Sequence, residues 1–279
     1  MNTYEKEYYE SESFWQGEML QDDWSKQRII QTAALIPEDV KSLIDVGCGN
    51  GVFVNFLKGS RPDLQLTACD RSQTALQFVQ VNKTEADITH LPFADNSFDC
   101  VSCLEVIEHL PEDMYQKALA ELLRVSRKYI IISVPYKEDL NNNMNRCPAC
   151  GIAFNYDLHL RRFTSATLKT LFGNAAQCTN TQLMGEMKFV IGKRILDKMA
   201  RRLKPLPWKS PLCPYCGYTS EEAKPEPSSN TVTKELIESS GSGSFYKTVR
   251  KIVAKIIPKE TRYYWKAGVY EKTTVRKSE

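Results

Sequence analysis

The sequence predicts an α/β fold in which a mostly parallel sheet is covered by helices on both faces. From residue 42 onward, short apolar runs alternate with segments of helical periodicity, which is typical of such a sheet. Two of these runs, 64–68 and 130–134, are apolar enough to be buried on both sides. Ligands of such sheets bind at the carboxyl ends of the strands. The residues that follow each strand are therefore the candidates for a site.

Composition sets the broad class. The 279 residues are 42% hydrophobic and 25% charged, which predicts one soluble domain with attachments. No window approaches the ~20 apolar residues of a membrane-spanning helix. The N-terminus lacks the basic start and apolar centre of a signal peptide, so we expect a cytoplasmic protein. The net charge of +3 is too small to imply a polyanionic partner.

Residues 1–36 form a predicted helical cap that is rich in Tyr, Trp and Glu. From Asp22 onward, apolar side chains follow an imperfect helical spacing up to Pro37, at Trp24, Ile29, Ala33 and Ile36. Two compatible interpretations remain open, a helix packed across the core and a lid over the substrate.

The core is predicted over 37–136. Strands are expected at 42–46, 64–69, around 84–88, 98–103 and 128–134, and helices near 51–59, 72–80 and 113–125. Beyond the core, 177–194 are expected to form a strand followed by a helix.

The first strand ends in a turn with glycine at alternate positions, Gly47, Gly49 and Gly51. Glycine is needed where the backbone adopts positive φ, or where a ligand lies too close for a Cβ atom. The helical pattern that follows makes this a strand, a tight turn and a helix N-terminus. The turn predicts a bound small molecule, although its G-x-G-x-G spacing differs from that of dinucleotide binders.

Acidic residues follow the next strands. Asp70 comes 19 residues after Gly51, where a carboxylate can hold the hydroxyls of a ribose. Asp87 and Ile88 follow the third strand, and Asp87 can accept a hydrogen bond from an exocyclic amine. The segment Glu105-Val-Ile-Glu-His-Leu110 follows the fourth strand.

Taken together, these motifs resemble the ordered motifs of class I S-adenosylmethionine-dependent methyltransferases, over residues 42–136. The resemblance implies a Rossmann-like, doubly wound sheet of seven strands, with 263–272 as an antiparallel C-terminal strand. It also implies the residues around the cofactor: Asp45, Gly47, Gly49 and Gly51 at the methionine moiety, Asp70 at the ribose, Asp87 and Ile88 at the adenine, and the backbone near Leu104 and Glu105 at the methionine end. Arg71 departs from the family pattern, which often has an apolar residue there, but its stem or guanidinium could stack on the adenine.

The acceptor is less defined. The Asn-Pro-Pro-Tyr-like turn of enzymes that methylate base amines is replaced by Cys103-Leu-Glu-Val-Ile, so a nucleobase amine is disfavoured. His159, with Arg161 and Phe163, resembles a segment that runs over the acceptor pocket of small-molecule enzymes. His159 and His109 are therefore candidate general bases, although a histidine at a helix end such as His109 more often has a structural role. A base is needed only for a poorly acidic hydroxyl.

Two Cys-x-x-Cys-Gly turns, at Cys147–Cys150 and Cys213–Cys216, lie in a predicted insertion over 137–220. Four thiolates can close a structural, tetrahedral zinc site that holds the insertion over the substrate side. A redox dithiol would explain one copy only, and four unrelated thiols are the remaining alternative.

Residues 221–243 are a predicted linker, rich in Pro, Ser, Glu and Gly. In 244–279, a basic amphipathic helix at 245–257 precedes the last strand. This helix could pack on the protein or lie on an anionic membrane.

Three functions follow. The favoured one is O-methyl transfer to a small molecule, such as a sugar, a lipid-linked glycan or a related metabolite, with nucleic acid disfavoured as a partner. The alternatives are an RNA methyltransferase that uses the zinc knuckle to bind RNA, and a non-catalytic scaffold that binds S-adenosylmethionine.

Overall fold

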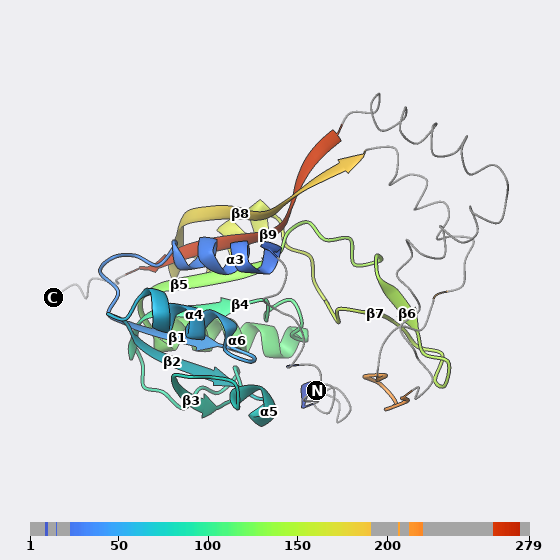
Figure 1. The fold of residues 1–279 in the computed structure, drawn as a ribbon, viewed down its shortest axis with the longest axis horizontal. Coiled ribbons are helices and arrows are strands. Elements are labelled where there is room, and N and C mark those ends of the chain that lie inside the picture. Colours follow the sequence, from blue (N-terminus) through green and yellow to red (C-terminus); the bar gives the residue numbers. More distant parts are fainter. Residues whose placement is uncertain are drawn as a thin grey trace. The chain divides into compact units, whose positions relative to one another are not determined.

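The computed structural model describes residues 9–10, 15, 23–190, 206, 212–219 and 259–273 (Figure 1). The predicted linker at 221–243 and the predicted basic helix at 245–257 lie outside these residues. The chain divides into two compact units. We call them the core unit, which comprises Met1–Asn142, Leu158–Gly185 and Tyr263–Glu279, and the cysteine unit, which comprises Asn143–Asp157 and Glu186–Arg262.

The main sheet has seven strands in the order β3-β2-β1-β4-β5-β9-β8. Their bounds are β1 Ser42–Val46, β2 Gln65–Asp70, β3 Asn82–Glu85, β4 Phe98–Leu104, β5 Ser126–Pro135, β8 Ala176–Val190 and β9 Lys259–Lys272. The first five strands pair in parallel, whereas β9 runs antiparallel to β5, with Ile130 opposite Tyr270. The predicted mostly parallel sheet with an antiparallel C-terminal strand is thus confirmed.

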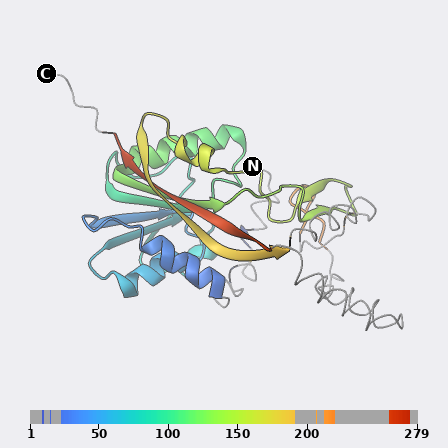
Figure 2. The same ribbon diagram turned by 90° about the horizontal axis from the view of Figure 1, so that it is seen from above.

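Helices cover both faces of this sheet. Helix α6, Glu112–Val125, lies on one face, and α3, Asp23–Ala33, and α4, Val52–Ser60, lie on the other (Figures 1 and 2). The apolar side of α6 packs against β4 and β5. Two short helices are also described, α5 at Gln73–Leu76 and α7 at Ser165–Lys169. Strands buried on both faces explain the continuous apolar runs in the sequence.

Local sequence signals explain several helix ends. Two acidic residues in the first turn of α6, Glu112 and Asp113, complement the partial positive charge of the helix N-terminus. The Thr164 side chain accepts a hydrogen bond from the Thr167 N–H in a capping box, so Thr164 is the N-cap of α7.

Some predicted elements were wrong in extent. The helix expected at 72–80 is reduced to α5 and continues as turns. No helix begins between 177 and 190, because β8 continues to Val190 beside the equally extended β9. The third strand lies at Asn82–Glu85, so the Asp87 segment follows it, and Trp24 is 42% exposed on α3 rather than in the core.

Smaller elements occupy the cysteine unit. A two-stranded antiparallel sheet of β6, Met144–Arg146, and β7, Ala153–Asn155, flanks the first Cys-x-x-Cys turn. In the described part of the chain, none of the helices combines the length and the apolar character that a membrane crossing requires.

Asp99 joins the starts of β1 and β4, and its substitution tests this junction. Its Oδ2 accepts hydrogen bonds from the Lys41 and Ser42 N–H groups, at 3.0 and 3.1 Å, and its Oδ1 pairs with Arg127. Burial opposes ionisation, but these donors outweigh it and lower the pKa of Asp99. We expect Asp99→Asn to reduce the free energy of unfolding by about 1–3 kcal/mol at pH 7, measured by urea denaturation.

The pH dependence provides the control. A lowered carboxyl pKa stabilises the fold above the ordinary value of 3.8, and this contribution is lost as the pH falls through the folded-state value. The difference between wild type and variant should therefore shrink below about pH 4. Asp63→Asn, at an exposed carboxylate, should have little effect at either pH, and a difference at pH 7 no larger than that of Asp63→Asn would contradict the assignment.

Candidate functional site

The glycine turn lies between β1 and α4 and depends on positive φ angles. Gly47, Gly49 and Gly51 have φ of 72°, 52° and 76°. The Gly47 and Cys48 N–H groups donate to the Cys69 carbonyl, at 2.8 and 3.1 Å, so the turn is tied to the end of β2. A Cβ atom on Gly47 would lie 2.5 Å from Val106 Cγ2. Glycine is thus required for both backbone conformation and space.

Asp70 connects this turn with the next loop. Its Oδ2 accepts from the Gly49 N–H at 2.8 Å, and its Oδ1 accepts from the Ser72 N–H at 2.9 Å. Burial raises the pKa of Asp70, although these backbone donors favour its ionised form. The carboxylate predicted to hold a ribose therefore also organises the two loops beside it.

Asp45 is the second buried carboxylate at this edge. It is 3% exposed, and its Oδ1 accepts from the Ser102 hydroxyl at 2.6 Å. Burial raises the pKa of Asp45 to about 7, with a further contribution from the charge of Asp70. A cation placed here would therefore stabilise both carboxylates.

Three described residues near the N-terminus contact this edge of the sheet: Trp15 contacts the glycine turn, and Tyr9 and Glu10 contact the loop that follows β2. The Trp15 ring lies over Gly49, where a Cβ atom would come within 2.7 Å of it, and the Asn50 amide donates to the Trp15 carbonyl at 3.0 Å. The Arg71 guanidinium lies 4.8 Å from the centre of the Tyr9 ring, and Glu10 accepts from the Ser72 hydroxyl. The aromatic composition of this segment was the only sequence signal for these contacts.

The Asp87 segment is arranged as a turn. The Asp87 Oδ1 accepts from the N–H and the hydroxyl of Thr89, at 2.8 and 2.7 Å, and its side chain is exposed. Ile88 is half-buried and packs against the core cluster. Ile88 therefore lies near the carboxyl end of the sheet, whereas the Asp87 carboxylate already serves its own turn.

Glu105 follows Leu104, at the end of β4, with a positive φ of 59°. Its N–H donates to the Ser133 carbonyl at 2.9 Å, and its Oε1 accepts from the Ser133 hydroxyl at 2.7 Å. Arg28 Nη1 of α3 lies 3.9 Å from the same oxygen. Burial raises the pKa of Glu105, and the positive charge of Arg28 opposes that effect.

The two candidate bases come together in the structure. The rings of His109 and His159 meet edge to face, with centroids 4.7 Å apart. His159 Nδ1 lies 2.5 Å from Glu138 Oε2, which orients the imidazole. Burial, with the nearby His159, lowers the pKa of His109 to about 3, so His109 stays neutral at pH 7 and is a weak base.

Sequence reasoning missed two acidic residues of this cluster, Glu108 and Glu138. Glu108 is fully buried, and burial together with the charge of Glu105 raises its pKa well above the ordinary value. Glu108 belongs to the Glu105–Leu110 motif found in the sequence, but a sequence motif does not reveal that the side chain is buried. Glu138 lies in a polar loop far from His159 in sequence, so no local signal connects them.

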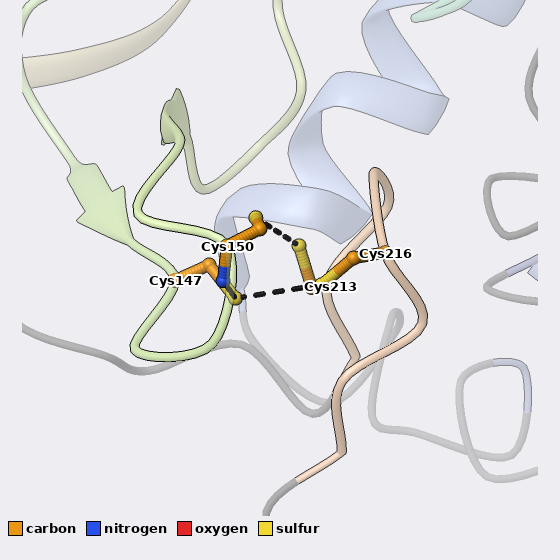
Figure 3. Close-up of side chains that lie close together, drawn as sticks. All are labelled: Cys147, Cys150, Cys213 and Cys216. Atoms are coloured by element: carbon orange, nitrogen blue, oxygen red, sulfur yellow. Dashed lines mark hydrogen bonds between the residues drawn. The ribbon is translucent and has the colours of Figure 1, made fainter.

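The four cysteines of the two Cys-x-x-Cys turns cluster within the cysteine unit (Figure 3). Their sulfur atoms all lie within 4.8 Å of one another, with Cys147 and Cys216 at 3.7 Å and Cys150 and Cys213 at 3.9 Å. A tetrahedral zinc with Zn–S bonds of ~2.3 Å requires S···S distances of about 3.8 Å. The cluster therefore fits a zinc ion.

The two turns also share one backbone geometry. The Gly151 N–H donates to the Cys147 carbonyl, and the Gly217 N–H donates to the Cys213 carbonyl, at 2.9 and 3.0 Å. Both glycines have positive φ, of 73° and 72°. Each turn is thus a knuckle that presents its two sulfurs to the shared centre, an arrangement that a single redox pair would not need.

Comparison with known proteins gives the family context. Residues 44–132 match a family model described as a methyltransferase domain. This range begins within β1, at Ile44, and ends within β5, at Ile132, so it includes the glycine turn, Asp70 and the Glu105–His109 segment.

Three curated relatives match parts of the chain. An uncharacterised protein of Methanocaldococcus jannaschii is 31% identical over 48% of the chain and 57% of its own length. The ubiquinone biosynthesis O-methyltransferase of Albidiferax ferrireducens is 30% identical over 28% of the chain and 34% of its length. The tRNA U34 carboxymethyltransferase of Campylobacter curvus is 37% identical over 36% of the chain and 37% of its length. The chain thus spans between a third and three fifths of these relatives.

Among solved structures, an S-adenosylmethionine-dependent methyltransferase of Archaeoglobus fulgidus matches with a TM-score of 0.50 and 15% identity. The match covers 96% of this chain and 98% of that one. At this identity it shows a shared fold.

The glycine turn yields a direct test. Gly47→Ala would combine an unfavourable φ with a clash against Val106, and we expect it to lower the free energy of unfolding by about 2–4 kcal/mol, measured by urea denaturation. Gly173→Ala is the matched control, because Gly173 also has a positive φ of 54° but nothing within 4 Å of the added Cβ. It should cost only about 1–2 kcal/mol. Equal losses would show that space at Gly47 is unimportant.

Proposed function

We propose that residues 44–132, which match the methyltransferase-domain model, form a class I, S-adenosylmethionine-dependent methyltransferase domain, and that it transfers the methyl group of S-adenosylmethionine to a hydroxyl of a small molecule. The observation that carries this proposal is the Gly47–Gly51 turn held by Asp70 at the carboxyl edge of the sheet. Such an edge is where doubly wound sheets bind ligands.

The cofactor would occupy the groups that converge at this edge. Asp70 would accept hydrogen bonds from the ribose hydroxyls, since each of its oxygens has a second lone pair beyond the one used by Gly49 or Ser72. Asp45 would lie near the cationic methionine end, together with the glycine turn and the backbone at Leu104 and Glu105. Ile88 and the Arg71 side chain would flank the adenine, with Asp87 at its amine.

Two observations support a hydroxyl acceptor, the name of one relative and the histidines near the expected methionine end. The relative from A. ferrireducens is named an O-methyltransferase, which favours a hydroxyl acceptor. His109 belongs to the same motif after β4 as Glu105, where the methionine end of the cofactor is expected, and its ring contacts His159, which Glu138 binds. A sugar, a lipid-linked glycan or a related metabolite remains the proposed acceptor. A peripheral membrane contact through 245–257 rests on sequence alone.

The chemistry requires chiefly positioning. The sulfonium makes its methyl group reactive, so the protein must align the acceptor oxygen, the methyl carbon and the sulfur. Such alignment can contribute on the order of 7–11 kcal/mol in favourable intramolecular cases. A neutral hydroxyl must also lose its proton, and His159, which Glu138 orients, is the candidate base for that step.

Asp70 tests the cofactor site. We expect Asp70→Asn to weaken S-adenosylmethionine binding about 10- to 100-fold by calorimetry, because hydrogen bonds to a carboxylate are lost, while circular dichroism shows an intact fold. Asp113→Asn, on the exposed first turn of α6, is the control and should bind normally. Unchanged affinity in Asp70→Asn would remove Asp70 from the site.

Labelled cofactor tests the acceptor class. Purified protein incubated with methyl-labelled S-adenosylmethionine should label a metabolite or lipid fraction of an extract. The tRNA enzyme among the relatives makes RNA the alternative to include. Transfer of label to RNA, with binding that falls steeply as salt rises, would contradict the small-molecule proposal.

We also propose that the four cysteines bind one structural zinc ion. The equal knuckles, the sulfur spacing and four soft ligands without an open position support a closed site. Elemental analysis should find one zinc per chain, and the double variant Cys147→Ser with Cys150→Ser should lose it.

Cys178→Ser is the control for this measurement, since Cys178 lies in the core unit outside the cluster. It should retain the zinc. A chain purified in the presence of zinc that holds none, or a double variant that keeps it, would contradict the zinc assignment.

A further inference from the structure

We propose that Glu108, His109 and His159 form a second metal site, which takes one divalent first-row transition ion such as Mn²⁺ and is separate from the cysteine cluster. The three residues belong to the core unit and come from two segments: Glu108 and His109 follow β4, and His159 precedes α7. One potential ligand atom from each lies within 4.8 Å of the others. An ion could therefore contact all three after small side-chain adjustments.

The first observation is the state of Glu108. Its side chain is 0% exposed, and neither carboxylate oxygen accepts a hydrogen bond from another residue that the structure describes. A buried carboxylate without partners is costly, and native proteins normally satisfy such groups. Arg28 faces the same region, but its Nη1 is directed to Glu105, 3.9 Å away. A cation bound by Glu108 would give its carboxylate oxygens the favourable partner that they lack among the described residues.

The adjacent residue, His109, also has a buried polar atom, Nδ1, without a hydrogen-bond partner among the described residues. In the tautomer that carries its proton on Nε2, the Nδ1 lone pair is available as a metal ligand. Two neighbouring groups with unsatisfied lone pairs, held beside a second imidazole, are explained together by one ion.

The surroundings hold these groups as metal sites usually do. Glu138 binds Nδ1 of His159 and leaves Nε2 as the ring nitrogen available to an ion, as in a carboxylate–histidine–metal arrangement. The Leu160 N–H donates to the Glu108 carbonyl at 2.8 Å, and Arg161 donates to the Ile107 carbonyl at 3.1 Å. These bonds join the two segments that supply the ligands, so the site is organised before an ion arrives.

The ligand set indicates the kind of ion. Two imidazole nitrogens and one carboxylate suit manganese, iron, cobalt or zinc, whereas magnesium and calcium prefer oxygen ligands alone. The four-thiolate cluster suits zinc. Three protein ligands also leave positions for oxygen atoms from outside the protein. The two centres therefore differ in ligand chemistry and in openness.

The role of this ion rests on the proposed function. A bound ion would take the acceptor hydroxyl as a ligand and lower its pKa, so that its proton leaves to solvent. The oxygen then forms a bond to the methyl carbon while the carbon–sulfur bond breaks, which converts the sulfonium to a neutral thioether. An acceptor with two neighbouring oxygens, such as a vicinal diol, would bind best because both oxygens can reach the ion. In this assignment the histidines are ligands rather than general bases.

The binding experiment uses the full chain with zinc in the cysteine cluster. Titration with Mn²⁺, followed by calorimetry and by electron paramagnetic resonance, should show one bound ion per chain. Glu108→Gln, which preserves shape, and His159→Ala should lose stoichiometric Mn²⁺ binding. Glu138→Gln, which alters only the group behind His159, should weaken binding about 10- to 100-fold. His90→Ala, an exposed histidine outside the cluster, is the matched control and should bind normally.

Two outcomes would overturn the inference: no stoichiometric binding of Mn²⁺ or Co²⁺ by folded wild-type protein, or binding that Glu108→Gln and His159→Ala leave unchanged. Thermal melts by circular dichroism confirm that each variant folds. Methyl transfer that continues in Glu108→Gln without added metal would refute the role of the ion. Metal binding without any S-adenosylmethionine binding would instead refute the proposed function and leave the metal site standing, so the two failures are distinguishable.

Discussion

Burial of negative charge is the constraint on which this structure depends. Four carboxylates lie buried or nearly so at the carboxyl ends of the parallel strands, where leaving water is costly. The first three have hydrogen-bond donors: the Ser102 hydroxyl for Asp45, two backbone N–H groups for Asp70, and the Ser133 hydroxyl for Glu105. Glu108 has none among the described residues. The first three carboxylates therefore have a structural role through their hydrogen bonds, whereas Glu108 is the carboxylate for which we propose a bound ion.

The same constraint connects the fold to the proposed chemistry. Burial raises the pKa values of Asp45 and Asp70, so a cation bound at this edge would interact favourably with two carboxylates and stabilise their ionised forms. S-adenosylmethionine carries positive charge on its sulfonium and its amino group, so its methionine end suits this environment. A proposed second cation, beside Glu108, would serve the acceptor rather than the cofactor.

The two units carry different coordination chemistry. The cysteine unit offers four sulfurs in two equal knuckles, which closes a centre and leaves no position for a substrate. The core unit offers two imidazoles and a carboxylate, which leaves positions open. Soft, closed sites stabilise local structure, whereas mixed, open sites can take part in reactions. Each ligand set therefore suits the role proposed for it.

By itself, the sequence determined the features that local patterns encode. These are the alternation of strands and helices, the positive-φ glycines of the turn, Asp70 at the end of β2 and the two knuckles, because each depends on residues close together in the chain. Only the tertiary structure decided which distant residues meet. Trp24 is exposed on α3, and β8 stayed extended beside β9. Trp15 reached Gly49, and His159 joined Glu108 and His109 across some fifty residues, because chain topology and burial, rather than spacing, bring such groups together.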